Sequence, residues 1–281
     1  MRAQTERYKA QAFEPRNLVI FFLIALGLNW LRAALVFFGI LKGSSGVADP
    51  SVLFATLAGW SPTIAAFLLT AFTEGKPGVS ALWTRFWNRN LSLKWLTVTL
   101  LFVPAIWLLA NLVTRLIGGW NNRLFDRPDL FFAQFAIALI ACLGEEFGWR
   151  GYVLPRFQVK WNALVSSLIL GVIWAAWHNR FYTGLILNPI FAGAFPQPDI
   201  WEFVVWIVTF SVFFTWIFNN THGSILMAVL FHTMMNAGSF IFWCCTYNWH
   251  WSAVLVAVAI LIVFLFGPKD LVRQRTEEGT G

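Results

Sequence analysis

Long apolar runs fill most of the chain and are separated by short polar stretches. Eight of these runs are near the roughly 20 residues that a helix needs to cross a bilayer. They cover about residues 17–41, 51–73, 94–117, 130–154, 162–182, 201–219, 224–245 and 251–267. The pattern predicts an all-α fold, a polytopic membrane helical bundle with about eight transmembrane helices.

One polar-apolar stretch, residues 76–92, has a different pattern from the long runs. Its apolar side chains, Leu82, Trp83, Phe86 and Trp87, recur at helical spacing, and Arg85 and Arg89 fall between them. This spacing predicts a short amphipathic helix that lies in the headgroup layer. We interpret it as a membrane anchor rather than a binding element.

The polar segments define the domain organisation and the orientation. We expect a single integral membrane domain over residues 1–281, with core helices in 130–245 and polar tails at 1–16 and 268–281. Lys and Arg gather before the first run, between the second and third, after the fourth and at the end. Because such residues favour the cytoplasmic side, this bias predicts a multi-pass cell-membrane protein with both termini in the cytoplasm.

The composition argues against a soluble domain and against a nucleic-acid-binding protein. The chain is 58% apolar and 12% charged, whereas soluble domains are about 25% charged. The net charge of +7 is explained by the loop bias, so we expect the lipid bilayer and no nucleic acid as a partner. The three cysteines have no metal or disulfide spacing and are interpreted as small apolar residues.

The fourth run contains the most informative polar residues, Glu145, Glu146 and Arg150. A charge in the middle of a bilayer costs about 2.5–3.5 kcal/mol, so such residues are candidates for function. Glu146 and Arg150 share a helix face at i and i+4 and can form an ion pair. Glu145 is rotated by about 100°, which makes it the freer carboxylate and the candidate general base. Gly144 and Gly148 would let a neighbouring helix approach closely.

Three further polar residues lie in later runs. His178 is a single histidine in an apolar helix, a position where a hydrogen-bonded core residue is commoner than a catalyst. His232 and Asn236 are i and i+4, so they offer two donors to one oxygen, as an oxyanion requires. The structural alternative is that all these groups only hold helices together.

A metal site has weaker support. Glu145, His178 and His232 have side chains that zinc accepts, but their spacing does not favour a metal, and no His-Glu-x-x-His signature occurs. No Ser or Cys is placed as a nucleophile by these groups.

Together these residues resemble the three motifs of the CPBP family of intramembrane proteases. The matching patterns are Glu145-Glu146-x-x-x-Arg150, an aromatic residue four positions before His178, and His232-x-x-x-Asn236. The family includes Ras-converting CAAX endopeptidases, which remove the last three residues of prenylated proteins, and bacteriocin-processing or self-immunity proteins. The resemblance covers about residues 141–240, and it departs at Trp174, where the family usually has Phe or Tyr.

The resemblance implies a role for each motif residue. Glu145 with His178 would activate water, Glu146 with Arg150 would order the site, and His232 with Asn236 would hold the oxyanion. A membrane-embedded or prenylated peptide would be the substrate, and a mechanism without a metal is favoured over one with zinc.

Two other functions stay open, a catalytically inert immunity or scaffold protein and a transporter. A transporter would show interrupted helices in matching halves, which the sequence lacks. The expected spans also place His178 about 9 Å further toward the outer face than Glu145. Catalysis therefore requires the helix that carries His178 to be displaced or its boundaries to differ.

Overall fold

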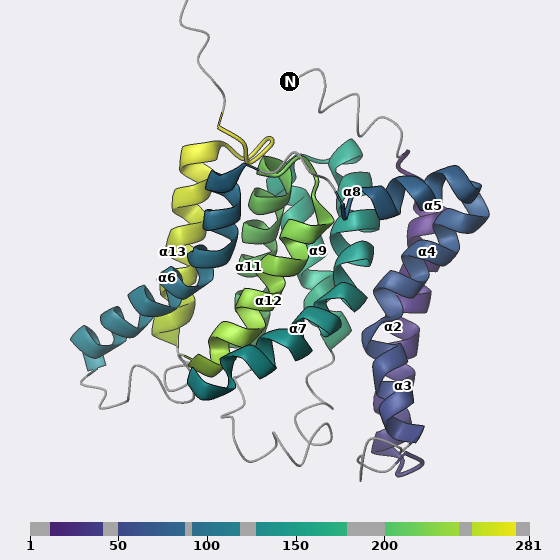
Figure 1. Cartoon of the computed structure of the whole chain (residues 1–281), viewed down its shortest axis with the longest axis horizontal. Helices are drawn as coiled ribbons and strands as arrows, with labels where there is room; N and C mark the ends of the chain where they lie inside the picture. Colours follow the sequence, from purple (N-terminus) through teal and green to yellow (C-terminus); the bar gives the residue numbers. More distant parts are fainter. Residues whose placement is uncertain are drawn as a thin grey trace, which may run out of the picture.

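The structure is a computed structural model of the chain that describes residues 12–41, 50–87, 92–118, 128–178, 200–241 and 249–273. Every regular element within these ranges is helical, so the predicted all-α fold is confirmed (Figure 1). The elements are α2 (Pro15–Phe37), α3 (Pro50–Gly59), α4 (Ser61–Thr73), α5 (Gly75–Thr84), α6 (Leu93–Gly118), η1 (Pro128–Leu130), α7 (Phe131–Glu146), η2 (Phe147–Val153), α8 (Leu154–Lys160), α9 (Ala163–His178), α11 (Ile200–Asn220), α12 (Ile225–Ile241) and α13 (Trp249–Phe266).

The described helices are those of a multi-pass membrane protein. Five are long and apolar enough to cross a membrane, namely α2, α6, the continuous α7–η2–α8, α11 and α13, and the bent pair α3–α4 is a sixth if it is one span. Helix α9 and residues Ile225–Gly238 of α12 are apolar but shorter. Each of the eight expected segments therefore contains helix, whereas eight crossings remain a prediction.

Both ends of the described chain lie at the same end of the bundle (Figure 1). The ring of Phe13 packs edge-on against Trp161, with 5.5 Å between the centroids. The backbone N–H of Ala163 donates to the carbonyl oxygen of Lys269 over 2.8 Å. This arrangement agrees with an even number of traverses, and the prediction that this end faces the cytoplasm remains untested.

The break between α3 and α4 follows from a proline. The two helices are bent by 60°, and Pro62, in the first turn of α4, has no N–H to offer the carbonyl of Ala58. The hydroxyl of Ser61 lies 2.7 Å from that carbonyl oxygen and 2.9 Å from the carbonyl oxygen of Ala25 in α2. A serine thus satisfies the backbone group that the proline leaves free, as apolar surroundings require.

The expected close approach at two glycines is confirmed. A Cβ added at Gly144 would lie 2.7 Å from the ring of Trp60, and one at Gly148 would lie 2.5 Å from the backbone of Pro62. The start of α4 therefore packs directly on α7 and η2, the segment that carries the paired glutamates.

The amphipathic segment forms α5 and a following turn up to residue 87, while 88–91 lie outside the described residues. Besides its exposed Trp83, it places Arg85 against η2, where Nη1 donates to the carbonyl oxygen of Gly151 over 2.7 Å. Phe147 of η2 stacks on Trp83 with 5.8 Å between the ring centroids. The segment therefore supports η2, and its position in the headgroup layer stays a prediction.

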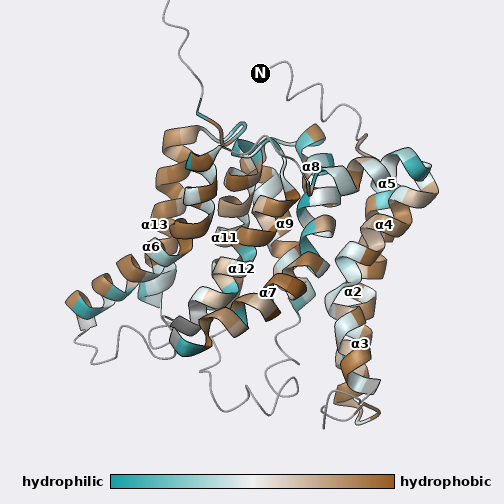
Figure 2. Cartoon of the chain, in the orientation of Figure 1, coloured by the Kyte–Doolittle hydropathy of each residue, from teal (hydrophilic) through white to brown (hydrophobic). Residues whose placement is uncertain are grey.

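Much of the ribbon of α6, α7 and α13 has the colour of apolar residues (Figure 2). Large apolar side chains are widely exposed there, among them Leu116, Phe132 and Phe264, which are 78%, 80% and 83% exposed. Such side chains suit contact with lipid.

Candidate active site

Helix α7 ends at the two adjacent glutamates and continues into η2, a π-helix that carries Arg150. π-Helical turns occur frequently at functional sites. The Nη1 atom of Arg150 donates to Oε1 of Glu146 over 2.8 Å, and both side chains are fully buried. The predicted ion pair is therefore confirmed.

Glu146 has a second partner that sequence reasoning missed, on a different helix. The Nδ1 atom of His232 in α12 lies 2.7 Å from the same Oε1 atom of Glu146. Because a carboxylate oxygen accepts and Nδ1–H donates, Glu146 receives hydrogen bonds from both a guanidinium and an imidazole. This contact joins the first and third sequence motifs directly.

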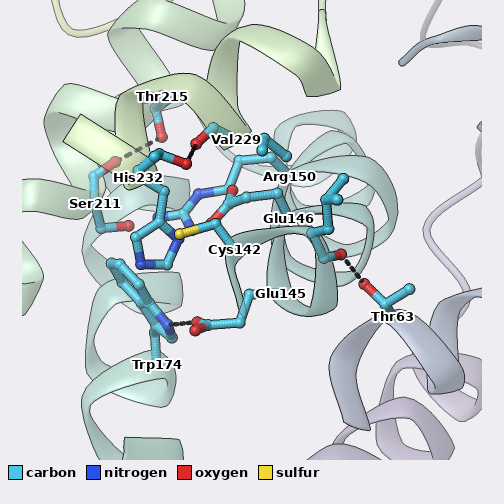
Figure 3. Close-up of polar contacts among 12 residues, drawn as sticks. Thr63, Cys142, Glu145, Glu146, Arg150, Trp174, Ser211, Thr215, Val229 and His232 are labelled. Carbon is cyan, nitrogen blue, oxygen red and sulfur yellow. Dashed lines mark hydrogen bonds and ion pairs between the residues drawn. The ribbon is translucent and has the colours of Figure 1, made fainter. Parts of the chain in front are cut away.

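Glu145 lies in a different environment, as its rotation from Glu146 predicts. Its side chain is 8% exposed, and its Oε2 atom accepts a hydrogen bond from the indole N–H of Trp174 in α9 over 2.8 Å (Figure 3). Trp174 thus joins the second motif to the first. From the sequence, Trp174 stood out only as a departure from the Phe or Tyr that is usual in the family.

The guanidinium of Arg150 is held by aromatic rings as well as by its carboxylate. Its central carbon lies 3.7 Å from the ring centroid of Phe214 and 4.4 Å from that of Trp174. Within the described residues, its Nε and Nη2 atoms have no hydrogen-bond partner. Cation–π contact therefore contributes to holding this buried charge.

His178 is the last described residue of α9, and residues 179–182 of the expected helix lie outside the described part. Its Nδ1 atom lies 2.8 Å from the carbonyl oxygen of Trp174, and its ring centroid is 5.2 Å from that of the Trp174 side chain. Since the same indole binds Glu145, the last two turns of α9 reach the level of the paired glutamates. Trp174 thus lies between His178 and Glu145, and the catalytic role of His178 remains a prediction.

Two side chains of α2 hold the end of α9 in this position. Asn29 donates from Nδ2 to the carbonyl oxygen of Trp177 over 2.6 Å, and Trp30 donates from Nε1 to that of Ala176 over 3.1 Å. These carbonyls belong to the last turn of the helix, where intrahelical partners are missing.

Asn236 lies one turn after His232 on α12, and its Nδ2 atom donates to Sγ of Cys142 over 3.6 Å. Cys142 is fully buried, and Figure 3 places its sulfur beside the imidazole of His232. The interpretation of Cys142 as a small apolar residue was therefore incomplete, because its thiol faces the site. The signal was its spacing, since Cys142 precedes Glu145 and Glu146 by three and four residues and shares their side of the helix.

The described residues give no direct support for a resident metal ion, and a mechanism without one remains a prediction. Among the ranges that the structure covers, no group of three or more His, Cys, Asp or Glu side chains could hold one. The oxygens Oε2 of Glu145 and Oε1 of Glu146 already accept hydrogen bonds from Trp174, Arg150 and His232. We therefore assign no step to a metal.

Comparison with known proteins agrees with the arrangement of these motifs. Residues 127–238 match the family model described as type II CAAX prenyl endopeptidase Rce1-like. The chain is also similar to CAAX prenyl protease 2 of Methanococcus maripaludis, with 26% identity over 185 residues, which cover 63% of this chain and 67% of that protein. The family match includes all six predicted site residues, from Glu145 to Asn236. Residues 127–238 therefore resemble the CAAX prenyl endopeptidases, as the sequence motifs predict, and the chain is a membrane-embedded peptidase.

Proposed function

We propose that this protein is an intramembrane endopeptidase that removes the C-terminal residues of a prenylated, CAAX-type membrane protein. Glu145 acts as general base, His178 assists it, and His232 with Asn236 binds the oxyanion. The observation that carries the proposal is the contrast between the two adjacent carboxylates of α7.

This contrast supports a division of roles. Glu146 is fully buried, and one of its oxygens accepts hydrogen bonds from both Arg150 and His232. Glu145 has a neutral indole as its hydrogen-bond donor and retains slight exposure. A carboxylate held in a fixed ion pair and sealed from solvent is a poor base, whereas one that meets a neutral donor and retains exposure can accept a proton from water. Glu145 is therefore the base and Glu146 the positioning group.

The contact between His232 and Glu146 supports the oxyanion role of the histidine. Glu146 accepts from Nδ1, so the oxyanion role requires the other ring nitrogen, Nε2. Nε2 donates only when the ring carries both protons, so His232 acts as an imidazolium. The Asn236 amide, one helical turn away, provides the second donor, and two fixed donors are what a tetrahedral oxyanion needs.

The backbone contact of His178 defines its tautomer. A carbonyl oxygen can only accept, so Nδ1 carries the proton that the carbonyl of Trp174 receives. In the neutral ring Nε2 then has a lone pair that can accept a proton. His178 thus assists Glu145 in holding the attacking water.

The reaction follows from these roles. Glu145 accepts a proton from water as the water oxygen attacks the scissile carbonyl carbon. The carbonyl oxygen becomes an oxyanion that His232 and Asn236 stabilise. When the C–N bond breaks, the proton held by Glu145 passes to the leaving amine, and the new carboxyl terminus remains on the substrate. General-base catalysis of this kind contributes about 10²–10⁴ in rate.

The substrate class rests on the family and on the surroundings of the site. The similar protein from Methanococcus maripaludis is named a CAAX prenyl protease, and the helices here expose large apolar side chains to their surroundings. A substrate that carries an isoprenoid would share this lipid environment. With both termini in the cytoplasm, as the charge bias predicts, the site would serve proteins attached to the cytoplasmic leaflet.

A reconstituted assay tests the proposal. The purified full-length chain in liposomes is given a farnesylated peptide ending in a CAAX sequence, with the unprenylated peptide as control. Mass spectrometry should detect the released tripeptide mainly from the farnesylated substrate. No cleavage of any peptide would favour the inert scaffold, and cleavage that ignores the isoprenoid would overturn the substrate class.

A further inference from the structure

Trp174 lies between the three catalytic motifs and is fully buried in α9. It donates its indole N–H to Glu145, and its backbone carbonyl accepts from His178. Its ring meets that of His232 edge-on, with 5.3 Å between the centroids. In the described part of the chain it therefore contacts a residue of each motif.

We propose that Trp174 is a positioning residue that fixes the carboxylate of Glu145 for water activation through its indole N–H. The inference rests on the proposed function, because Glu145 must be the base. An indole nitrogen can only donate, so this bond takes the Oε2 atom and leaves Oε1 for water. A glutamate side chain has three rotatable bonds, and a single fixed donor removes much of that freedom.

The indole also suits its place between opposite charges. An aromatic ring has a negative face and a positive edge. The guanidinium of Arg150 lies over the face of Trp174, 4.4 Å from the ring centroid, while Glu145 meets the N–H edge. Both charges are thus stabilised by one neutral side chain, so Glu145 is held without forming a hydrogen-bonded ion pair with Arg150. Phenylalanine would preserve the face contact and lose the N–H.

Packing alone does not explain this hydrogen bond. Trp107 and Trp149 are also buried, and within the described residues neither indole nitrogen has a hydrogen-bond partner. The fold therefore accepts buried indoles with unused N–H groups. The pairing of Trp174 with Glu145 is a specific feature of the site.

The matched variants Trp174→Phe and Trp149→Phe test the role of the N–H in the farnesylated-peptide assay. Both remove a buried indole N–H, but Trp149 has no hydrogen bond to lose. Trp174→Phe should lower kcat roughly 10- to 100-fold, as expected for a misplaced catalytic group, with little change in KM. Trp149→Phe should leave kcat within about twofold of the wild type. A Trp174→Phe enzyme as fast as the wild type would overturn the inference while leaving the proposed function intact.

A second measurement, which needs no catalytic turnover, tests the hydrogen bond between Trp174 and Glu145. The thermal unfolding midpoints of the wild type, Trp174→Phe, Glu145→Met and the double variant form a double-mutant cycle. Trp174→Phe should lower the midpoint of the wild type and should not lower that of Glu145→Met, which has no carboxylate to bind. Additive shifts would contradict the inference. If the wild type cleaves no peptide, the proposed function fails, and the cycle still tests the bond between Trp174 and Glu145.

Discussion

His232 of α12 lies with Nδ1 2.7 Å from Oε1 of Glu146 at the end of α7. The bond crosses between motifs that are 86 residues apart in the chain. It fixes the orientation of the imidazole relative to α7. In the proposed mechanism Glu146 acts through His232, whereas Glu145, its neighbour in sequence, acts on water.

Removing the imidazole should therefore remove an oxyanion donor. We expect His232→Ala to lower kcat by about 10²–10³, the usual loss for one such donor. Glu146→Gln should cause a smaller fall, because the amide oxygen can still accept from Nδ1 while the imidazolium loses the negative charge that stabilises it. His250→Ala is the matched control, since His250 is exposed at the start of α13. Equal rates for His232→Ala and His250→Ala would exclude His232 from the mechanism.

Arg150→Met should destabilise the protein by about 3 kcal/mol, because it leaves the buried carboxylate of Glu146 without its guanidinium. This estimate is near the lower end of the range for broken buried pairs because the hydrogen bond from His232 remains. Thermal unfolding in detergent measures the change. The double variant Glu146→Gln/Arg150→Met should recover most of the stability and remain slow, since two matched neutral groups replace the pair. An Arg150→Met protein as stable as the wild type would contradict the assigned pair.

Gly148→Ala should reduce stability by about 1–3 kcal/mol through overpacking. Its Cβ would lie 2.5 Å from the backbone of Pro62, which has no rotamer to change. The control is Gly27→Ala in α2, where nothing lies within 4 Å of the added carbon. Unfolding midpoints should fall for Gly148→Ala only, and equal midpoints would contradict the close packing of α4 on η2.

The apolar runs predicted the helices well because length and hydropathy alone determine which segments suit a bilayer. Spacing on one helix predicted the pair of Glu146 with Arg150. Contacts between helices could not be predicted, because no sequence pattern indicates which face of α12 packs against α7. The links from His232 to Glu146, from Trp174 to Glu145 and from Asn236 to Cys142 are all of this kind. The position of His178 also depended on how α9 sits against its neighbours.

Chelators should leave cleavage unchanged. The proposed mechanism relies on Glu145 and two imidazoles, and the described residues form no three-ligand cluster for a metal. The measurement compares turnover before and after prolonged dialysis against a strong chelator, followed by addition of zinc. Activity that disappears on dialysis and returns with zinc would require a metal-dependent mechanism instead.

The central claim is that the carboxylate of Glu145 accepts the proton of the attacking water. Glu145→Gln tests it most directly, because the amide keeps the size of the side chain and an oxygen for the indole of Trp174 but cannot act as a base. The measurement is the single-turnover cleavage rate of the farnesylated peptide in liposomes, with folding checked by the unfolding midpoint. The account predicts a fall of about 10²–10⁴ in a folded protein. A Glu145→Gln enzyme that cleaves at the wild-type rate would contradict it.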